Sequence, residues 1–188
     1  MNVLWRSQEV IKATKGVCFH KWNASGVSID SRKVKKGDIF CAMPGTKYDG
    51  HNFVDNAFNN GAVASIVSRD TLFKKSYPIV KVKDVPVALK NLAISARSRY
   101  KSKIIGITGS VGKTGTKEML RLSLGAFGRV HANESSFNNH VGVPLSLARL
   151  PEESDFSIIE LGMNSKNEIA ENSKIVKPDL AIITNVEV

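Results

Sequence analysis

The chain has 188 residues, 42% of them hydrophobic and 23% charged, which is typical of a globular protein of one or two domains and excludes a disordered or fibrous one. No apolar run approaches the ~20 residues that span a bilayer, and the first ten residues, with Arg6 and Glu9, lack the apolar segment of a secretory signal. Cys18 and Cys41 have neither metal-site nor redox spacing, so we expect a reduced, cytoplasmic protein without membrane insertion.

The net charge of +10 is confined to the first half of the chain. Residues 1–100 contain 17 lysines and arginines against 7 acidic residues, whereas residues 101–188 contain ten of each. This asymmetry favours an anionic partner for the first half, either a nucleic acid or a phosphorylated small molecule. On charge alone, a generally basic surface is the simpler explanation. A nucleic-acid binder ranks last, because only 7% of the residues are aromatic.

Strand and helix patterns alternate along the chain, which predicts an α/β fold with parallel sheets. In the first half the expected strands are 27–30, 38–43, 62–67 and 79–82, and the expected helices are 49–60 and 84–100. In the second half the expected strands are 104–107, 129–132, 156–160 and 180–184, and the expected helices are 114–125, 143–150 and 164–176. We place a domain junction at 101–103, which gives a small α/β domain (1–100) and part of a P-loop domain with a parallel sheet (101–188). Because the chain stops directly after a strand, we expect it to be a fragment.

The strand expected at 104–107 leads into a glycine-punctuated loop, and a helix follows. The loop reads Thr108, Gly109, Ser110, Val111, Gly112, Lys113, Thr114. Glycines let successive N–H groups point at phosphate oxygens, Lys113 supplies a positive charge, and the Thr114 hydroxyl is placed to ligate Mg²⁺. The G-x-x-x-x-G-K-[ST] form is not met, since position 107 is Ile, and a solvated turn is the alternative. The flanking strand and helix favour phosphate binding.

Polar residues also follow other predicted elements. Glu160 ends an apolar strand and is placed to be a second Mg²⁺ ligand, because ligands gather beyond the carboxyl ends of parallel strands. Asn138 and Asn139 precede a helix start; turn and cap chemistry explains one asparagine well and two less well. We interpret His131 and His140 as ordinary surface or loop histidines. A GTPase is rejected, because the segment 184–187 lacks the lysine and aspartate of Asn-Lys-x-Asp.

These motifs together resemble the Mur ligases, the ATP-dependent amide-forming enzymes of peptidoglycan synthesis. In the second half the likeness covers the loop 108–114, the segment 116–119, Asn138-Asn139-x-x-Gly142-x-Pro144 and the segment 159–164 with Glu168-Ile169. In the first half, the segments 28–32, 37–40 and Asp49-Gly50-His51-x-Phe53, together with Gly45, are similar to the family's uridine-nucleotide-binding domain. The motifs are most similar to the branch of the family that adds D-alanyl-D-alanine.

The resemblance implies specific roles for these residues. The loop Thr108–Thr114 would bind ATP, Thr114 and Glu160 would hold Mg²⁺, and Lys113, Asn138 and Asn139 would be catalytic. Ser31 and Arg32 would contact the uridine diphosphate of UDP-N-acetylmuramoyl-tripeptide, whose carboxylate would become an acyl phosphate and then an amide with D-alanyl-D-alanine.

The resemblance also carries expectations about the whole protein. The family's following histidine, carbamylated lysine and C-terminal domain lie beyond residue 188, so we expect this chain by itself to be inactive. We expect a monomer, with no nucleic-acid partner. The alternative function is a non-catalytic module that binds a UDP-sugar and carries an incomplete P-loop.

Overall fold

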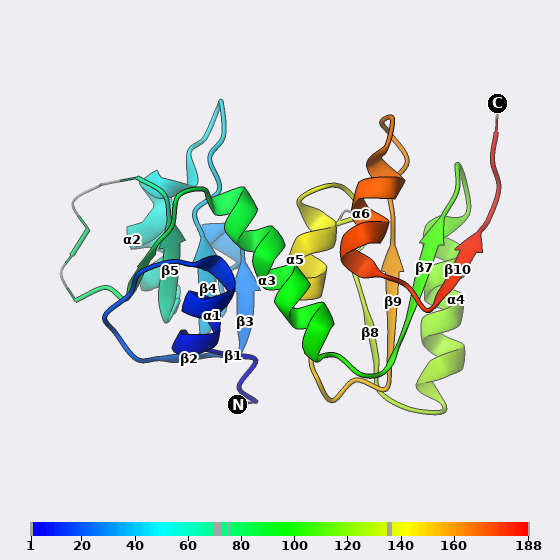
Figure 1. Cartoon of the computed structure of the whole chain (residues 1–188), viewed down its shortest axis with the longest axis horizontal. Coiled ribbons are helices and arrows are strands. Elements are labelled where there is room, and N and C mark those ends of the chain that lie inside the picture. Colours follow the sequence, from blue (N-terminus) through cyan, green and yellow to red (C-terminus); the bar gives the residue numbers. More distant parts are fainter. Residues whose placement is uncertain (1, 70–72, 75, 135–136, 188) are drawn as a thin grey trace. The chain divides into compact units, whose positions relative to one another are not determined.

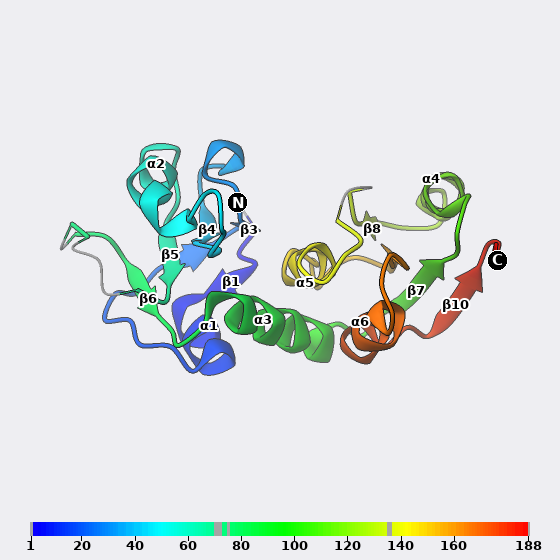
Figure 2. The ribbon, with the colours of Figure 1, turned by 90° about the horizontal axis from the view of Figure 1, so that it is seen from above.

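The computed structural model describes residues 2–69, 73–74, 76–134 and 137–187, and all structural statements concern these residues. The chain separates into two compact units, residues 1–92 and 93–188, each with its own parallel sheet (Figures 1 and 2). This boundary falls within helix α3 (Val85–Arg99), ahead of the junction expected at 101–103. The α/β class with parallel sheets is confirmed.

In the first unit, a four-stranded parallel sheet has the order β3-β4-β5-β6. Its strands are β3 (Gly26–Ser28), β4 (Asp38–Cys41), β5 (Ala64–Val67) and β6 (Ile79–Lys81). The central strands β4 and β5 are buried along their whole length, as expected for parallel strands covered on both faces. The strands expected from the sequence are confirmed, with bounds shifted by up to two residues.

The remaining elements of this unit are short. They are β1 (Trp5–Arg6), α1 (Ser7–Thr14), β2 (Asn23–Ala24), the 3₁₀ turns η1 (Ser31–Lys33) and η2 (Gly50–Phe53), and α2 (Val54–Asn59). Strands β1 and β2 pair antiparallel, with Trp5 opposite Ala24. The sequence analysis did not predict β1, α1 or β2. The single helix expected over 49–60 is instead a 3₁₀ turn followed by α2.

In the second unit, the parallel sheet has the order β10-β7-β9-β8. Its strands are β7 (Lys103–Thr108), β8 (Val130–Ala132), β9 (Phe156–Glu160) and β10 (Leu180–Ile183), and its helices after α3 are α4 (Lys113–Gly125), α5 (Gly142–Ala148) and α6 (Glu168–Val176). The helix expected from residue 164 is wrong at its start. Asn167 adopts a left-handed conformation (φ 66°), which ends the preceding turn, and the helix begins only at Glu168.

Alternation along β7 and β9 decides which side chains face which helix. Ile105, Ile107 and Ile158 form one apolar cluster with side chains of α4, while Ile104 and Ile159 belong to a second cluster that contains residues of α5 and α6. Glu160 lies two residues after Ile158 and therefore faces α4. Figure 2 shows α4 on one side of the sheet and α6 on the other. Within the described residues, no helix combines the length and apolar character needed to cross a membrane.

Asp179 ties the loop before β10 to the start of β7. Its carboxylate accepts a hydrogen bond from the Ile104 N–H at 2.9 Å and pairs with Lys103 and Arg97, each at 3.4 Å. Arg97 also donates to the carbonyls of Val176 and Lys177 at the end of α6. The hydrogen bond from Ile104, followed by the charge of Lys103, lowers the pKa of Asp179.

We expect Asp179→Asn to lower the free energy of unfolding by about 1 kcal/mol at pH 7, because the charged acceptor and its ion pairs are lost. Since the folded-state pKa of Asp179 lies below 3.8, its contribution is complete above that value and disappears as the pH falls through the folded-state pKa. Urea unfolding at pH 7 and pH 2.5 measures both effects. A difference between the two proteins that is as large at pH 2.5 as at pH 7 would contradict an electrostatic origin.

Candidate active site

The loop between β7 and α4 adopts conformations that require glycine. Gly109 has φ +139° and Gly112 has φ +83°, both in the region that residues with a side chain rarely adopt. A Cβ added at Gly109 would overlap the Thr184 hydroxyl and lie 2.8 Å from the Asn185 carbonyl oxygen. The loop therefore depends on its two glycines and on the end of the neighbouring strand β10.

The segment after β10 holds the loop from one side. The Ser110 N–H donates to the Asn185 carbonyl at 2.7 Å, and the Glu187 N–H donates to Ser110 Oγ at 3.0 Å. Thr184 Oγ1 donates to the Val111 carbonyl at 2.6 Å. On the other side, the hydroxyl of Thr108 donates to the Leu161 carbonyl at 3.1 Å. These contacts within the protein fix the backbone of the loop.

Lys113 begins α4 and lies over this loop. Its ammonium donates to the carbonyl oxygens of Gly109 and of Ser110, the latter at 3.2 Å. The N–H groups of the first helical turn have no partner within the helix, and the helix dipole adds positive potential there. A lysine, free N–H groups of a helix start and a glycine loop together form an anion site that suits a polyphosphate.

Thr114 and Glu160 meet at the edge of this site. The hydroxyl of Thr114 lies 3.1 Å from Oε2 of Glu160, whose side chain is only 2% exposed. A hydroxyl and a carboxylate are hard oxygen donors, the type that Mg²⁺ prefers. The described residues contain no group of three or more His, Cys, Asp or Glu able to hold a metal. By the chemistry of its two oxygen donors, the pair of Thr114 and Glu160 fits a Mg²⁺ ion that takes its other ligands from phosphates and water.

The two predicted asparagines have different contacts. Asn138 Nδ2 donates to Glu160 Oε1 at 2.9 Å, so it touches the predicted metal ligand. Asn139 is exposed, and its Oδ1 accepts hydrogen bonds from the N–H groups of Val141 and Gly142 at the start of α5. The structure thus brings Asn138 into the site and gives Asn139 the contacts of a turn and helix cap.

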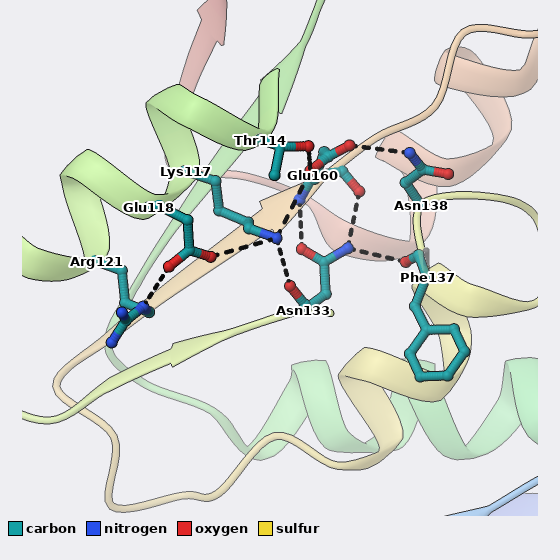
Figure 3. A network of polar contacts seen from close by, with 8 residues as sticks. All are labelled: Thr114, Lys117, Glu118, Arg121, Asn133, Phe137, Asn138 and Glu160. Carbon is teal, nitrogen blue, oxygen red and sulfur yellow. Dashed lines mark hydrogen bonds and ion pairs between the residues drawn. The ribbon is translucent and has the colours of Figure 1, made fainter. Parts of the chain in front are cut away.

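A further buried network continues from Glu160 (Figure 3). Lys117, on α4, donates to the Asn133 carbonyl at 2.8 Å and lies 3.7 Å from Glu160 Oε2. Asn133 in turn holds the peptide of Glu160: its Oδ1 accepts from the Glu160 N–H at 2.8 Å and its Nδ2 donates to the Glu160 carbonyl at 3.1 Å. The sequence analysis assigned no role to Lys117 or Asn133. The spacing of Lys117, one helical turn after Thr114, is the signal that would have found it.

In the first unit, Ser31 and Arg32 lie in the turn η1. Asp30 caps this turn by accepting the Arg32 N–H at 3.0 Å, and it also pairs with the guanidinium at 2.8 Å. The hydrogen bond from the Arg32 side chain lowers the pKa of Asp30. Ser31 is buried, whereas the Arg32 side chain is 81% exposed. Arg32 is thus an exposed residue whose guanidinium is held by Asp30 through Nε and Nη2.

Asp49, Gly50 and His51 form a rigid turn in the same unit. His51 is buried; its Nδ1 lies 2.6 Å from Asp49, and its Nε2 accepts the Ser68 N–H at 2.9 Å. A Cβ at Gly50 would lie 2.7 Å from the backbone of Met43. Because the Ser68 N–H already occupies Nε2, this histidine orients a loop rather than activating the Ser68 hydroxyl.

The interpretation of His131 as a surface or loop residue is wrong. It lies in β8, and its Nε2 donates to the Ser146 carbonyl at 3.1 Å. Burial lowers the pKa of His131 to about 4, so the ring is neutral at pH 7. Its sequence position, three residues after Gly128, gave no sign that its side chain would lie against α5.

Two family profiles match the chain along most of its length. The profile described as "Mur ligase family, catalytic domain" matches residues 23–100, and "Mur ligase middle domain" matches residues 107–188. The chain belongs to the Mur ligase family. The resemblance inferred from the motifs is confirmed.

Relatives within the Mur ligase family carry a more specific name. The UDP-N-acetylmuramoyl-tripeptide–D-alanyl-D-alanine ligase of Rickettsia prowazekii is 38% identical over 98% of this chain, and that of Bacillus subtilis is 38% identical over 86%. The chain spans 41% and 35% of the lengths of these two relatives, respectively.

Solved Mur ligase structures agree with the fold. A UDP-N-acetylmuramoylalanyl-D-glutamyl-2,6-diaminopimelate–D-alanyl-D-alanyl ligase from Acinetobacter baumannii is 35% identical, with a TM-score of 0.84 over 95% of this chain and 41% of its own. The Thermotoga maritima MurF ligase in complex with ADP is 32% identical, with a TM-score of 0.72 over 86% of this chain and 38% of its own.

We expect Gly109→Ala in this Mur ligase chain to lower the free energy of unfolding by about 1–3 kcal/mol, because it forces a left-handed alanine against Thr184 and Asn185. Gly115→Ala is the matched control: nothing lies within 4 Å of its added Cβ, and alanine favours the helix. The control should raise the free energy of unfolding by about 0.5–1 kcal/mol. Thermal and urea unfolding of both variants measure this contrast. Equal effects of the two changes would contradict the loop geometry.

Proposed function

We propose that this chain is the uridine-nucleotide-binding part and the nucleotide-binding part of an ATP-dependent ligase that joins D-alanyl-D-alanine to UDP-N-acetylmuramoyl-tripeptide. The observation that carries the proposal is that Thr114 Oγ1 and Glu160 Oε2 lie 3.1 Å apart, beside the glycine-containing loop 108–114. The names of the curated relatives support the substrates, and the ADP complex of the Thermotoga maritima structure supports the binding of an adenine nucleotide.

The reaction has two steps. A carboxylate oxygen of the tripeptide forms a bond to the γ-phosphorus of ATP while the bond from that phosphorus to the β,γ-bridging oxygen breaks, which gives an acyl phosphate and ADP. The amine of D-alanyl-D-alanine then attacks the acyl carbon, loses a proton and expels phosphate. Both steps bring anionic or electron-rich groups together, so catalysis depends on compensating negative charge and on orientation.

The residues of this chain would supply much of that compensation. Lys113 would exchange the carbonyls of Gly109 and Ser110 for phosphate oxygens, and the N–H groups of the first turn of α4 would bind the same phosphates. Thr114 and Glu160 would hold Mg²⁺, which when bound neutralises triphosphate charge. Asn138, held on Glu160, would border the nucleotide and the reacting carboxylate, and Asn139 would shape the turn beside it.

The first unit would hold the uridine diphosphate. The exposed guanidinium of Arg32 is suited to phosphate oxygens, and the buried Ser31 precedes it in the turn. The excess of ten positive charges in residues 1–100 favours an anionic ligand there. We include a cytoplasmic location in the proposal, and the free thiols of Cys18 and Cys41 support it. A monomeric state remains an expectation from the family resemblance.

We expect Lys113→Ala to weaken the binding of ADP in the presence of Mg²⁺ at least tenfold, because the positive charge proposed to contact the β-phosphate is removed. Isothermal titration calorimetry on the whole chain measures the effect. Lys101→Ala removes the same charge before β7, at the opposite end of that strand from the loop, and should change the affinity less than twofold. Equal ADP affinities for the native chain and Lys113→Ala would overturn the assignment of the loop.

A second expectation concerns the first unit. Arg32→Ala should weaken the binding of UDP to the whole chain about fivefold to tenfold, because a charge-assisted contact to phosphate is lost. Lys12→Ala, which removes an exposed charge from α1, serves as the control for net charge. If both variants weaken UDP binding equally, the effect comes from the basic surface as a whole and Arg32 is not part of a site.

A further inference from the structure

Lys117 is the most deeply buried charged side chain near the site, and the proposed function gives it no role. Its side chain is only 1% exposed. A lysine is rarely buried to this extent unless its ammonium is paired and hydrogen-bonded, since desolvation of the charge is costly. Here the pairing is with the site itself: the ammonium lies 3.7 Å from Glu160 Oε2, and it donates to the Asn133 carbonyl at 2.8 Å.

The position of Lys117 on α4 aims it at Glu160. It follows Thr114 by three residues, so both side chains project from the same face of the helix. Figure 3 shows Thr114 and Lys117 both reaching the carboxylate at the end of β9. Oε2 of Glu160 therefore lies between a hydroxyl and an ammonium from one helix, and Oε1 is held by Asn138 from the opposite side.

Asn133 closes the network through the backbone. Its side-chain amide makes two hydrogen bonds to the peptide of Glu160, and its own carbonyl accepts from Lys117. Lys117 thus contacts Glu160 at the carboxylate and, through Asn133, at the main chain. These contacts link the ammonium of Lys117 to both the side chain and the main chain of Glu160.

We propose that Lys117 is a positioning residue of the metal site: it compensates the buried charge of Glu160 and holds its Oε2 beside Thr114, where both oxygens can ligate the same cation. This inference rests on the proposed function of Thr114 and Glu160. The side chains that ligate a metal are commonly oriented by hydrogen bonds and charges behind them, and loss of such partners typically weakens metal affinity by 10- to 100-fold.

Two opposite effects follow from removing the ammonium. A positive charge beside the site repels a cation, so its loss would tighten metal binding if repulsion were dominant. If positioning is dominant, Glu160 becomes a buried carboxylate without its compensating charge and turns away from Thr114 toward other donors, which weakens metal binding. The sign of the change in metal affinity therefore separates the two effects.

The test uses the whole chain, with ADP and Mn²⁺ or Mg²⁺ as probes. The measured quantity is the coupling ratio, the Kd for ADP without metal divided by the Kd with metal, obtained by calorimetry; electron paramagnetic resonance measures bound Mn²⁺ directly. We expect Lys117→Met to reduce the coupling ratio and the Mn²⁺ affinity about tenfold, while the Kd for metal-free ADP changes less than threefold. Glu118→Gln is the matched control, because Glu118 also pairs with Lys117, at 3.7 Å, but has no contact with Glu160 among those described; it should leave the ratio within twofold.

Each outcome decides the proposal. An unchanged or increased coupling ratio in a folded Lys117→Met protein, even with a lowered melting temperature, would mean that Lys117 is structural only or mainly repels the metal. If Lys117→Met does not fold by circular dichroism, Lys117→Gln, which keeps a donor for the Asn133 carbonyl, should show at least a threefold reduction. Failure of both variants to fold would also assign a purely structural role. If the native chain binds ADP without any metal coupling, the proposed metal site fails first, and the inference fails with it.

Discussion

The buried carboxylate of Glu160 is the constraint around which the second unit is arranged. A charge that is 2% exposed is tolerated only where donors surround it, and here they come from three places in the chain. Thr114 and Lys117 reach it from α4, Asn138 reaches it from the turn before α5, and Asn133 holds its backbone. Because these contacts converge on one residue, they connect the end of β9 with the start of α4, the segment after β8 and the turn before α5.

The pairing of β10 with β7 sets the shape of the loop 108–114. Strand β10 pairs with β7 so that Ile183 lies opposite Thr108, which places Thr184 directly beside the loop. Thr184 then bonds to the Val111 carbonyl and leaves no room for a side chain at Gly109. The left-handed conformation of Gly109 is therefore set by pairing in the sheet as well as by the loop sequence. A shift of β10 along β7 would disturb the loop without any change in the loop itself.

Much of this arrangement could be predicted from the sequence. Apolar β-branched runs predicted the main strands, and the rule that ligands gather beyond the carboxyl ends of parallel strands brought the loop and Glu160 together. The two-residue strands β1 and β2 could not be predicted, because they are too short to show an alternation of apolar and polar residues. They are defined only by the pairing of Trp5 with Ala24. The spacing of Lys117 after Thr114 was visible in the sequence, but its burial was not, because that burial depends on β9, which lies about forty residues further along the chain. Asn139 and Asn138 are adjacent and identical, so only their contacts distinguish a cap from a site residue.

Lys113 and Lys117 both lie on α4, but they differ in burial and therefore in the role that each can have. Lys113 is partly exposed and rests on the carbonyls of Gly109 and Ser110, neutral groups that it can leave for a more strongly charged partner. Lys117, one turn later, is enclosed: it donates to the Asn133 carbonyl and lies 3.7 Å from the carboxylate of Glu160, whose side chain is 2% exposed. Displacing Lys117 would leave the buried carboxylate of Glu160 without its positive partner. Displacing Lys113 would leave only the neutral carbonyls of Gly109 and Ser110. The helix thus presents one lysine that can leave its neutral partners for a charged ligand and one that is fixed, and only the fixed one can hold the carboxylate of Glu160, the metal ligand that we propose, in place.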